Sequence, residues 1–266
     1  MTRRLLVLGN SHLAALADGW RAQPGRWPGV ELRFVGAHGE RLLETELRDG
    51  TLRPASAAAA QDFARLGGGE GVALAGYDGI IIAGAMVALA SAAALWREMR
   101  WVGLPSLAAE PDLATMAPAL VSRQAAQAAL VARLSARLGL RLAARLRAGC
   151  DLPIWIASQP RVSETILDRP RPATRAHAEA LRLGDGAALS AWFDTAATIA
   201  ARQAGAAFVP QPPATITRDI LTARRFTRGA TRLAARPGLA QPGDDILHAN
   251  GAWGAQMLDA VLGAAG

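Results

Sequence analysis

Lysine is absent from this chain of 266 residues, and cysteine and tyrosine each occur once. A single cysteine, Cys150, cannot form an internal disulfide, so the sequence predicts neither a disulfide framework nor an oxidising compartment. We expect Cys150 to be a buried or half-buried thiol. With 51% hydrophobic residues and no dividing linker, the chain is expected to fold as one domain spanning residues 1–266.

Every one of the 29 basic residues is arginine, which gives a net charge of +7 and a pI of 11.2. Few groups titrate between neutral pH and the arginine range, so the pI does not indicate a large excess of charge, and we predict no nucleic-acid partner. A basic stripe lies beside a leucine stripe on a predicted helix, at Arg133, Arg137, Arg141 and Arg145. We interpret it as the solvated face of an amphipathic helix, with contact to a phosphate or an anionic surface as the alternative.

Signals for a metal or a cofactor are also missing. The four histidines are scattered along the sequence, with no spacing typical of a zinc site. No Gly-x-Gly-x-x-Gly fingerprint follows the first predicted strand, and the glycine-rich segment 67–71 lacks the Gly-Lys-Ser/Thr ending of a phosphate-binding loop. We therefore expect no metal and no cofactor.

Two apolar segments do not reach what a membrane signal requires. The apolar run at residues 5–8 stops after four residues, well short of the apolar region of a secretory signal. The uncharged segment 79–95 begins with three isoleucines but continues with alanine, serine and glycine, which favours a buried strand followed by a helix. We predict no membrane contact and a cytoplasmic location.

Strand-like apolar runs alternate with helical patterns along the chain, which is typical of parallel βαβ units. Strands are predicted near residues 4–8, 31–36, 79–83, 153–157 and 206–209, and helices near 12–21, 55–66, 87–100, 120–147, 187–204 and 252–263. An Asp-Gly pair predicts a small hairpin inserted near residues 46–54. The expected fold class is therefore α/β, a three-layer doubly wound sheet of about five parallel strands.

The residues that carry chemistry lie at the two ends of the chain. Gly9-Asn10-Ser11-His12 directly follows the first predicted strand, which places the Ser11 hydroxyl beside free backbone N–H groups, as a serine nucleophile requires. Asp245-Ile246-Leu247-His248 supplies an acid and a base, although the adjacent Asp244 could exchange roles with Asp245. This Ser…Asp…His order recurs in serine hydrolases built on open α/β sheets.

These residues resemble the SGNH or GDSL-type hydrolases, whose nucleophile lies in a Gly-Asp-Ser block after strand one and whose acid and base form an Asp-x-x-His block. Gly39 stands where that family keeps the glycine of its second block, and Asn10 replaces the usual Asp. The third block departs further, because Gly84-Ala85-Met86 replaces Gly-x-Asn and a thioether cannot donate a hydrogen bond. The resemblance implies an SGNH-hydrolase or flavodoxin-like domain that acts on esters.

The resemblance also implies an oxyanion hole formed by the N–H groups of Ser11 and Gly39. A third donor has to replace the missing asparagine, and prolines after the fourth and fifth predicted strands hold two glutamines at the carboxyl edge of the sheet. We expect Gln159 to be this donor, with Gln211 or a backbone N–H near Ala85 as alternatives. Both glutamines could instead satisfy loop carbonyls.

In the predicted mechanism, His248 accepts the Ser11 proton as the hydroxyl attacks an ester carbonyl, and Asp245 orients and stabilises the imidazolium. We expect His177, among its arginine neighbours, to lie at the surface. The irregular segments near 40–54, 101–118, 159–175 and 213–244 are expected to form pocket walls. Three further residues are expected to face the substrate: His12, His38 and Asn250.

Three function classes fit these residues. The first is a serine esterase that removes an acyl group, such as acetyl, from a carbohydrate or small metabolite, where the substrate class rests on the resemblance alone. The second is an acyltransferase in which a sugar hydroxyl intercepts the same acyl-enzyme. The third is a noncatalytic binding protein that retains the fold, which the methionine in the third block would allow. The expected partner is a small-molecule or carbohydrate ester, and the sequence does not predict an oligomeric state.

Overall fold

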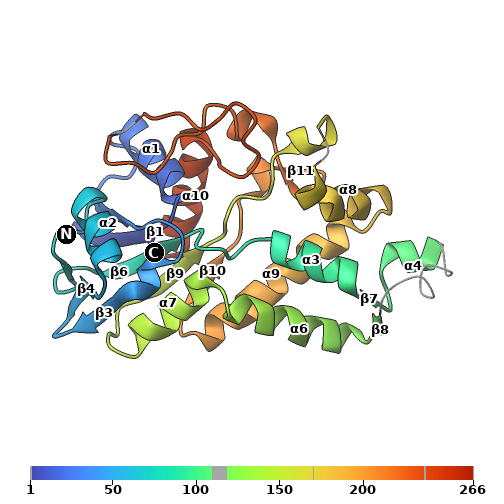
Figure 1. Ribbon diagram of the computed structural model, residues 1–266, viewed down its shortest axis with the longest axis horizontal. Helices are drawn as coiled ribbons and strands as arrows, with labels where there is room; N and C mark the ends of the chain where they lie inside the picture. The colour runs from blue at the N-terminus through green and yellow to red at the C-terminus, as the bar shows by residue number, and fades with distance from the viewer. Residues whose placement is uncertain (1, 110–118, 170, 237, 266) are drawn as a thin grey trace.

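The computed structural model describes residues 2–109, 119–169, 171–236 and 238–265. Its centre is a parallel sheet of five strands in the order β10-β9-β6-β1-β2 (Figure 1). All five predicted strands are present, and every bound lies within one residue of the prediction. This strand order is compatible with a doubly wound α/β fold. The strands are β1 (Arg3–Gly9), β2 (Val30–Gly36), β6 (Gly79–Ala83), β9 (Ile154–Ala157) and β10 (Ala207–Val209).

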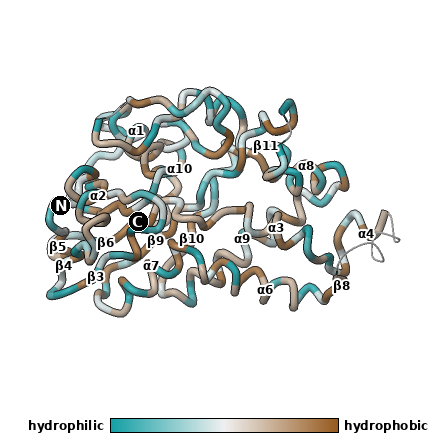
Figure 2. Tube along the Cα trace, in the orientation of Figure 1, coloured by the Kyte–Doolittle hydropathy of each residue, from teal (hydrophilic) through white to brown (hydrophobic). Residues whose placement is uncertain are grey.

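Helices cover both faces of this sheet, and its strand residues alternate between two cores. One core contains Leu6 and Leu8 together with residues of α3 (Ala90–Glu98), α6 (Arg123–Ser135), α7 (Leu138–Arg147) and α9 (Gly186–Gln203). The other core contains Leu5 and Val7 together with α1 (Leu13–Ala22) and α10 (Gly251–Ala264). The strands β6 and β9 and residues 5–9 of β1 are buried on both faces and are therefore apolar runs, which are largely brown in Figure 2. The edge strand β2 instead carries Glu31 and Arg33.

The helix predicted over residues 120–147 is in fact two helices, α6 and α7. The leucine stripe persists through the break, since Leu130, Leu134, Leu138, Leu142 and Leu146 are all buried. The chain is extended at Arg137 (φ −81°, ψ 154°), and the N–H of Gly139 donates to the carbonyl of Ala85 at 2.8 Å. The break therefore brings the start of α7 against the loop that follows β6.

The hairpin predicted near residues 46–54 is confirmed. Strands β3 (Thr45–Arg48) and β4 (Thr51–Pro54) pair antiparallel, and both residues of the turn, Asp49 and Gly50, have positive φ, as a tight two-residue hairpin turn requires. A third strand, β5 (Val72–Ala73), joins β4 and was not predicted.

Several shorter elements surround this frame. The predicted helix near 55–66 is α2 (Ala57–Arg65), which begins with a hydrogen bond from the N–H of Ala59 to the Ser56 hydroxyl. Among the described residues, two α-helices were not predicted, α4 (Pro105–Ala109) and α8 (Arg175–Arg182). The short pairs are β7 (Arg100–Trp101) with β8 (Leu120–Val121) and β11 (Ile216–Thr217) with β12 (Leu221–Thr222). Cys150 is half-buried, as expected. Among the described residues, no helix combines the length and apolar character that crossing a membrane needs.

The register of the sheet aligns the carboxyl ends of its strands. Gly9 is paired with Gly36 on one side and with Ala83 on the other, and Ala83 is paired in turn with Ala157. The loops that leave these strands therefore start from one level. In open α/β sheets, ligands bind at this carboxyl edge, where the strand order reverses, and here that position lies between β1 and β6.

Glycines bring α1 and α10 into main-chain contact. A Cβ atom built on Gly254 would lie 1.8 Å from the carbonyl oxygen of Ala15, and one built on Gly19 would lie 2.5 Å from the backbone nitrogen of Ala255. No side chain fits at either position, because real Cβ atoms do not approach backbone this closely. Ser11 lies just before α1 and His248 just before α10, so this contact joins the two ends of the sequence that carry the chemistry.

Candidate active site

Three side chains form a continuous hydrogen-bonded chain at the carboxyl edge of the sheet. Nε2 of His248 lies 2.9 Å from Oγ of Ser11, and Nδ1 of the same ring lies 2.7 Å from Oδ2 of Asp245. The serine and the histidine are 237 positions apart in the sequence. This is the arrangement in which an imidazole can take the proton of a hydroxyl while a carboxylate holds the ring.

The Asp245 carboxylate is held firmly and stays ionised. Its Oδ1 accepts hydrogen bonds from the backbone N–H groups of Leu247 and His248, at 2.7 and 2.8 Å. Burial raises the pKa of this carboxyl, but hydrogen bonds from the His248 side chain and from these N–H groups outweigh burial and lower the pKa to about 2. Asp244 instead pairs with Arg171 at 2.8 Å, so the acid of the chain is Asp245.

Asn10 shapes the turn that presents the nucleophile. Its side-chain oxygen accepts a hydrogen bond from the backbone N–H of His12 at 3.3 Å, which bends the chain around Ser11. An amide oxygen serves this purpose as a carboxylate would, which gives a physical reason for Asn in place of the Asp of the resembling family.

His12 was expected to face the substrate, but the structure buries it and packs its ring on the imidazole of His248. Its imidazole stacks on that of His248 with ring centroids 4.8 Å apart and planes at 21°. Burial lowers the pKa of His12 to about 3, and the neighbouring imidazole of His248 acts in the same direction. The third-block turn also packs on this residue, since a Cβ atom on Gly84 would lie 2.8 Å from Cβ of His12. The ring is therefore neutral above about pH 3 and contacts both the third-block turn and His248.

We expect His12 to position His248, so His12→Ala should lower kcat by about ten- to a hundredfold, because small displacements of catalytic groups are costly. His12→Phe, which keeps a stacked ring, should retain most of the activity.

Unfolded His12 takes up a proton near pH 6.5, whereas the buried ring does so only near pH 3. Protons therefore bind the unfolded chain more tightly, and the free energy of unfolding decreases as the pH falls from about 6.5 toward about 3. Urea unfolding at pH 7 and pH 4 should show a smaller pH effect in His12→Phe than in wild type, and an equal effect would contradict the buried neutral ring.

The glycine of the second block lies in a loop held by Asp62. This carboxylate, on α2, accepts hydrogen bonds from the backbone N–H and from Nδ1 of His38, both at 2.8 Å. It also forms an ion pair with Arg41 at 3.1 Å. Burial raises the pKa of Asp62, but these hydrogen bonds outweigh it and lower the pKa overall. Gly39 has a φ of +58°, and its N–H makes no hydrogen bond among the described residues. That N–H group is available to a ligand, and its role as an oxyanion donor stays a prediction.

The third block forms a turn with an uncommon backbone. Gly84, Ala85 and Met86 all have positive φ, at 67°, 44° and 65°. Non-glycine residues in this region cost about 1–2 kcal/mol each and cluster at functional sites. The Met86 side chain packs against the core and offers no donor, whereas the N–H groups of Ala85 and Met86 make no hydrogen bond within the described part of the chain. Successive N–H groups in such a turn can form a concave site for an anion.

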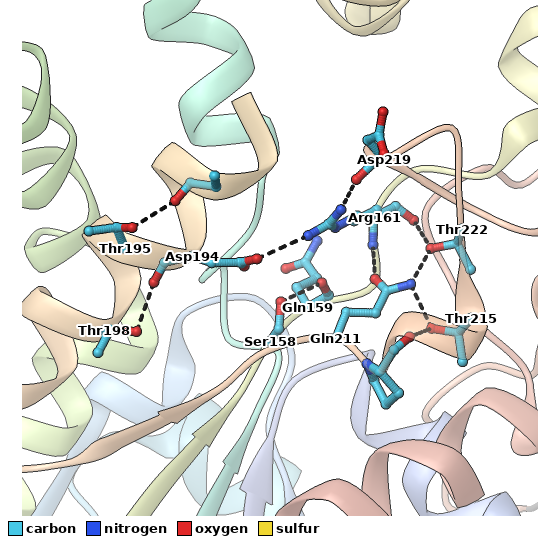
Figure 3. A network of polar contacts seen from close by, with 12 residues as sticks. Ser158, Gln159, Arg161, Asp194, Thr195, Thr198, Gln211, Thr215, Asp219 and Thr222 are labelled. Atoms are coloured by element: carbon cyan, nitrogen blue, oxygen red, sulfur yellow. Dashed lines mark hydrogen bonds and ion pairs between the residues drawn. The ribbon is translucent and has the colours of Figure 1, made fainter. Parts of the chain in front are cut away.

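The two glutamines that were expected as possible oxyanion donors differ in the structure. Gln211 is not available as a donor, because its amide nitrogen donates to the hydroxyls of Thr215 and Thr222, at 2.9 and 3.1 Å. Its oxygen accepts from the N–H of Arg161 at 2.8 Å, so the whole side chain belongs to a buried network (Figure 3). Gln159 lies at the end of β9 beside this network and is half-buried. Its role as a donor stays a prediction.

Two other expectations change. Asn250 was expected to face the substrate, but it caps α10 by accepting from the N–H of Trp253 at 3.2 Å, and its amide donates to the carbonyls of Arg225 and Arg228. Both N–H donors of this side chain are therefore used within the protein, and its oxygen serves as the helix cap. His177 was expected at the surface but is buried in α8, and burial lowers its pKa to about 4. His38 keeps about half of its side chain exposed, and its substrate contact stays a prediction.

Sequence reasoning missed the residues that support the site. The glycine pattern Gly251-x-x-Gly254, directly after the histidine block, is the signal that could have indicated a close helix contact. Asp62 lies 24 positions from His38 on a different element, and no local pattern links the two.

Within the described residues, no group of three or more His, Cys, Asp or Glu side chains is arranged to hold a metal ion.

Comparisons with protein-family models, with curated proteins and with solved structures found no match to this chain. Function is therefore inferred from the geometry of the site.

Proposed function

We propose that this protein is a serine esterase of the SGNH type, which hydrolyses an O-acyl ester of a carbohydrate or small metabolite through Ser11, His248 and Asp245. The observation that carries the proposal is the pair of hydrogen bonds, 2.9 and 2.7 Å long, that joins these three side chains. The order of the central strands and the place of Ser11 after β1 support the SGNH assignment within the broader α/β class.

In the proposed reaction, His248 removes the hydroxyl proton of Ser11 as Oγ attacks the ester carbonyl. The carbonyl oxygen becomes an oxyanion, and the imidazolium that forms is stabilised by the ionised Asp245. His248 then returns the proton to the leaving alcohol, which leaves an acyl-enzyme. A water molecule, deprotonated by the same imidazole, attacks the acyl-enzyme, and the acid product and free Ser11 result.

The proposed oxyanion hole combines backbone and side-chain donors. The N–H groups of Ser11 and Gly39 lie in the loops after β1 and β2, whose ends are aligned by the sheet register. The third donor is Gln159 or an N–H group of the turn at Ala85 and Met86, and the positive φ values of that turn favour the backbone donors. Backbone N–H groups would perform the role for which the resembling family uses asparagine.

The missing asparagine also supports a second candidate, a noncatalytic binding protein that retains the fold. The two candidates differ in whether Ser11 is nucleophilic. A fluorophosphonate reacts covalently with an activated serine, so we expect wild type to be labelled at Ser11 in close to one-to-one stoichiometry, as measured by intact mass and peptide mapping. Folded protein without label would favour the binding protein.

A matched control separates activation from accessibility. Ser122 is an exposed serine that caps the N-terminus of α6, which is the ordinary structural role of such a serine. Ser122→Ala should be labelled as fully as wild type, whereas Ser11→Ala should not be labelled.

A cytoplasmic location stays part of the proposal.

A further inference from the structure

A cavity of about 440 Å³ adjoins the acid end of the triad. It is lined by residues of three irregular segments, 165–171, 224–230 and 241–246, of which residue 170 lies outside the described part of the chain. Asp245 is part of the wall, so one imidazole ring and two hydrogen bonds separate this cavity from Oγ of Ser11. These segments fall mainly within two of the predicted pocket walls, 159–175 and 213–244. The volume is within the range of small-molecule sites.

The charged groups on the cavity wall leave an excess of positive charge. Arg171 is paired with Asp244, and Arg224 with Asp168, while Asp245 is engaged with His248. Two more arginines line the same cavity and have no acidic partner among the described residues: Arg169 and Arg228. Both are exposed, so their guanidinium groups are accessible to a ligand.

The backbone that carries these arginines is fixed to the catalytic loop. Asn250 lies two residues after the proposed catalytic His248, and its amide donates to the carbonyls of Arg225 and Arg228, both at 2.8 Å. The N–H of Arg224 donates to Oε1 of Glu164 at 2.8 Å, which ties the second segment to the first. A site supported in this way keeps its position relative to the triad.

We propose that this cavity binds an anionic group of the substrate, a carboxylate or a phosphate, so that the ester is an acidic one. The inference rests on the proposed esterase function and narrows its substrate class. The planar N–H donors of arginine match the oxygens of these anions. The two cations without partners also offset the repulsion that the Asp245 carboxylate exerts on an anion bound beside it.

Matched pairs of esters test this proposal and locate the anion. The acyl side is tested with mono-p-nitrophenyl glutarate against p-nitrophenyl valerate, which has an acyl chain of the same length without the charge. The alcohol side is tested with 4-acetoxybenzoate against 4-acetoxybenzamide. We expect one charged member to exceed its neutral partner by about tenfold or more in kcat/KM at low ionic strength, as charge-assisted hydrogen bonds allow. Added salt should reduce the preference.

Variants assign the preference to the cavity. Combining Arg169→Gln with Arg228→Gln should lower the charged-to-neutral ratio of kcat/KM by about tenfold. Arg182→Gln removes an exposed arginine of α8 that does not line the cavity, and it should leave the ratio unchanged. Equal ratios in wild type and in the double variant, or the same loss in the control, would overturn the proposal.

Calorimetry keeps this inference distinct from the proposed reaction. Glutarate and inorganic phosphate are titrated into Ser11→Ala with and without the two arginine substitutions, and the anion that binds identifies the preferred chemistry. Anion binding that depends on Arg169 and Arg228, combined with a wild-type protein that hydrolyses neither ester of any pair, would refute the esterase and retain the anion site. Neutral esters hydrolysed with no anion bound would retain the esterase and refute the site.

Discussion

Replacing Ser11 by alanine is expected to lower kcat for ester hydrolysis by at least about 10⁴-fold, because no acyl-enzyme can form without the hydroxyl. The imidazole of His248 loses only one hydrogen-bond partner, so the fold should be retained. The measurement is hydrolysis of p-nitrophenyl esters of increasing chain length by wild type and by the variant, which also shows the acyl length that the site prefers.

Far-UV circular dichroism and urea unfolding would show whether the Ser11→Ala protein is folded. The matched control is Ser122→Ala, which removes a cap hydroxyl and is expected to cost about 1 kcal/mol of stability without a large effect on kcat. A folded Ser11→Ala protein with activity within tenfold of wild type would show that Ser11 is not the nucleophile.

Asp245→Asn is expected to lower kcat by about 10⁴-fold, although the side chain keeps its size. Oδ1 can still accept from the N–H groups of Leu247 and His248, which leaves the amide nitrogen facing Nδ1 of His248. That nitrogen donates where an acceptor is needed, so the ring adopts the tautomer whose Nε2 already carries a proton. Such a ring cannot accept the proton of Ser11.

Asp244→Asn is the matched control for this substitution. The neighbouring Asp244 is exposed and paired with Arg171, and exposed pairs contribute at most about 1 kcal/mol. We expect its effect on hydrolysis of a neutral ester to stay within about threefold. A larger loss in Asp244→Asn than in Asp245→Asn would reverse the two roles. Because the pKa of Asp245 is about 2, lowering the pH to 4 does not reproduce the loss of its charge.

The central strands could be predicted closely because β6, β9 and most of β1 are buried on both faces and are therefore apolar runs. The edge strands β2 and β10 are partly exposed, and β2 carries Glu31 and Arg33. The candidate triad could be predicted because its members follow local markers, a glycine turn after β1 for Ser11 and the Asp-x-x-His spacing for the acid and base. The hairpin followed from its Asp-Gly turn. In each case the physical constraint acts on neighbouring residues, and a sequence records such constraints directly.

Other features depend on contacts between distant segments. The leucine stripe continues at the same spacing across the break between α6 and α7, so the pattern cannot show where Gly139 turns toward Ala85. The arginines beside His177 suggest a surface, but α8 packs its apolar face inward and buries that ring. Gln211 bonds to Thr215 and Thr222, which follow it in the chain, and to Arg161, 50 positions away. Sequence alone does not reveal such pairings.

The contact between α1 and α10 has a consequence for how this protein could change over evolutionary time. The spacing between the proposed nucleophile and the proposed base depends on the place where two backbones touch, at Gly19 and Gly254, and no larger residue fits there. Selection for activity and selection for packing therefore act on the same few atoms. On this basis we expect substitutions to be tolerated in the irregular loops far better than at these two glycines.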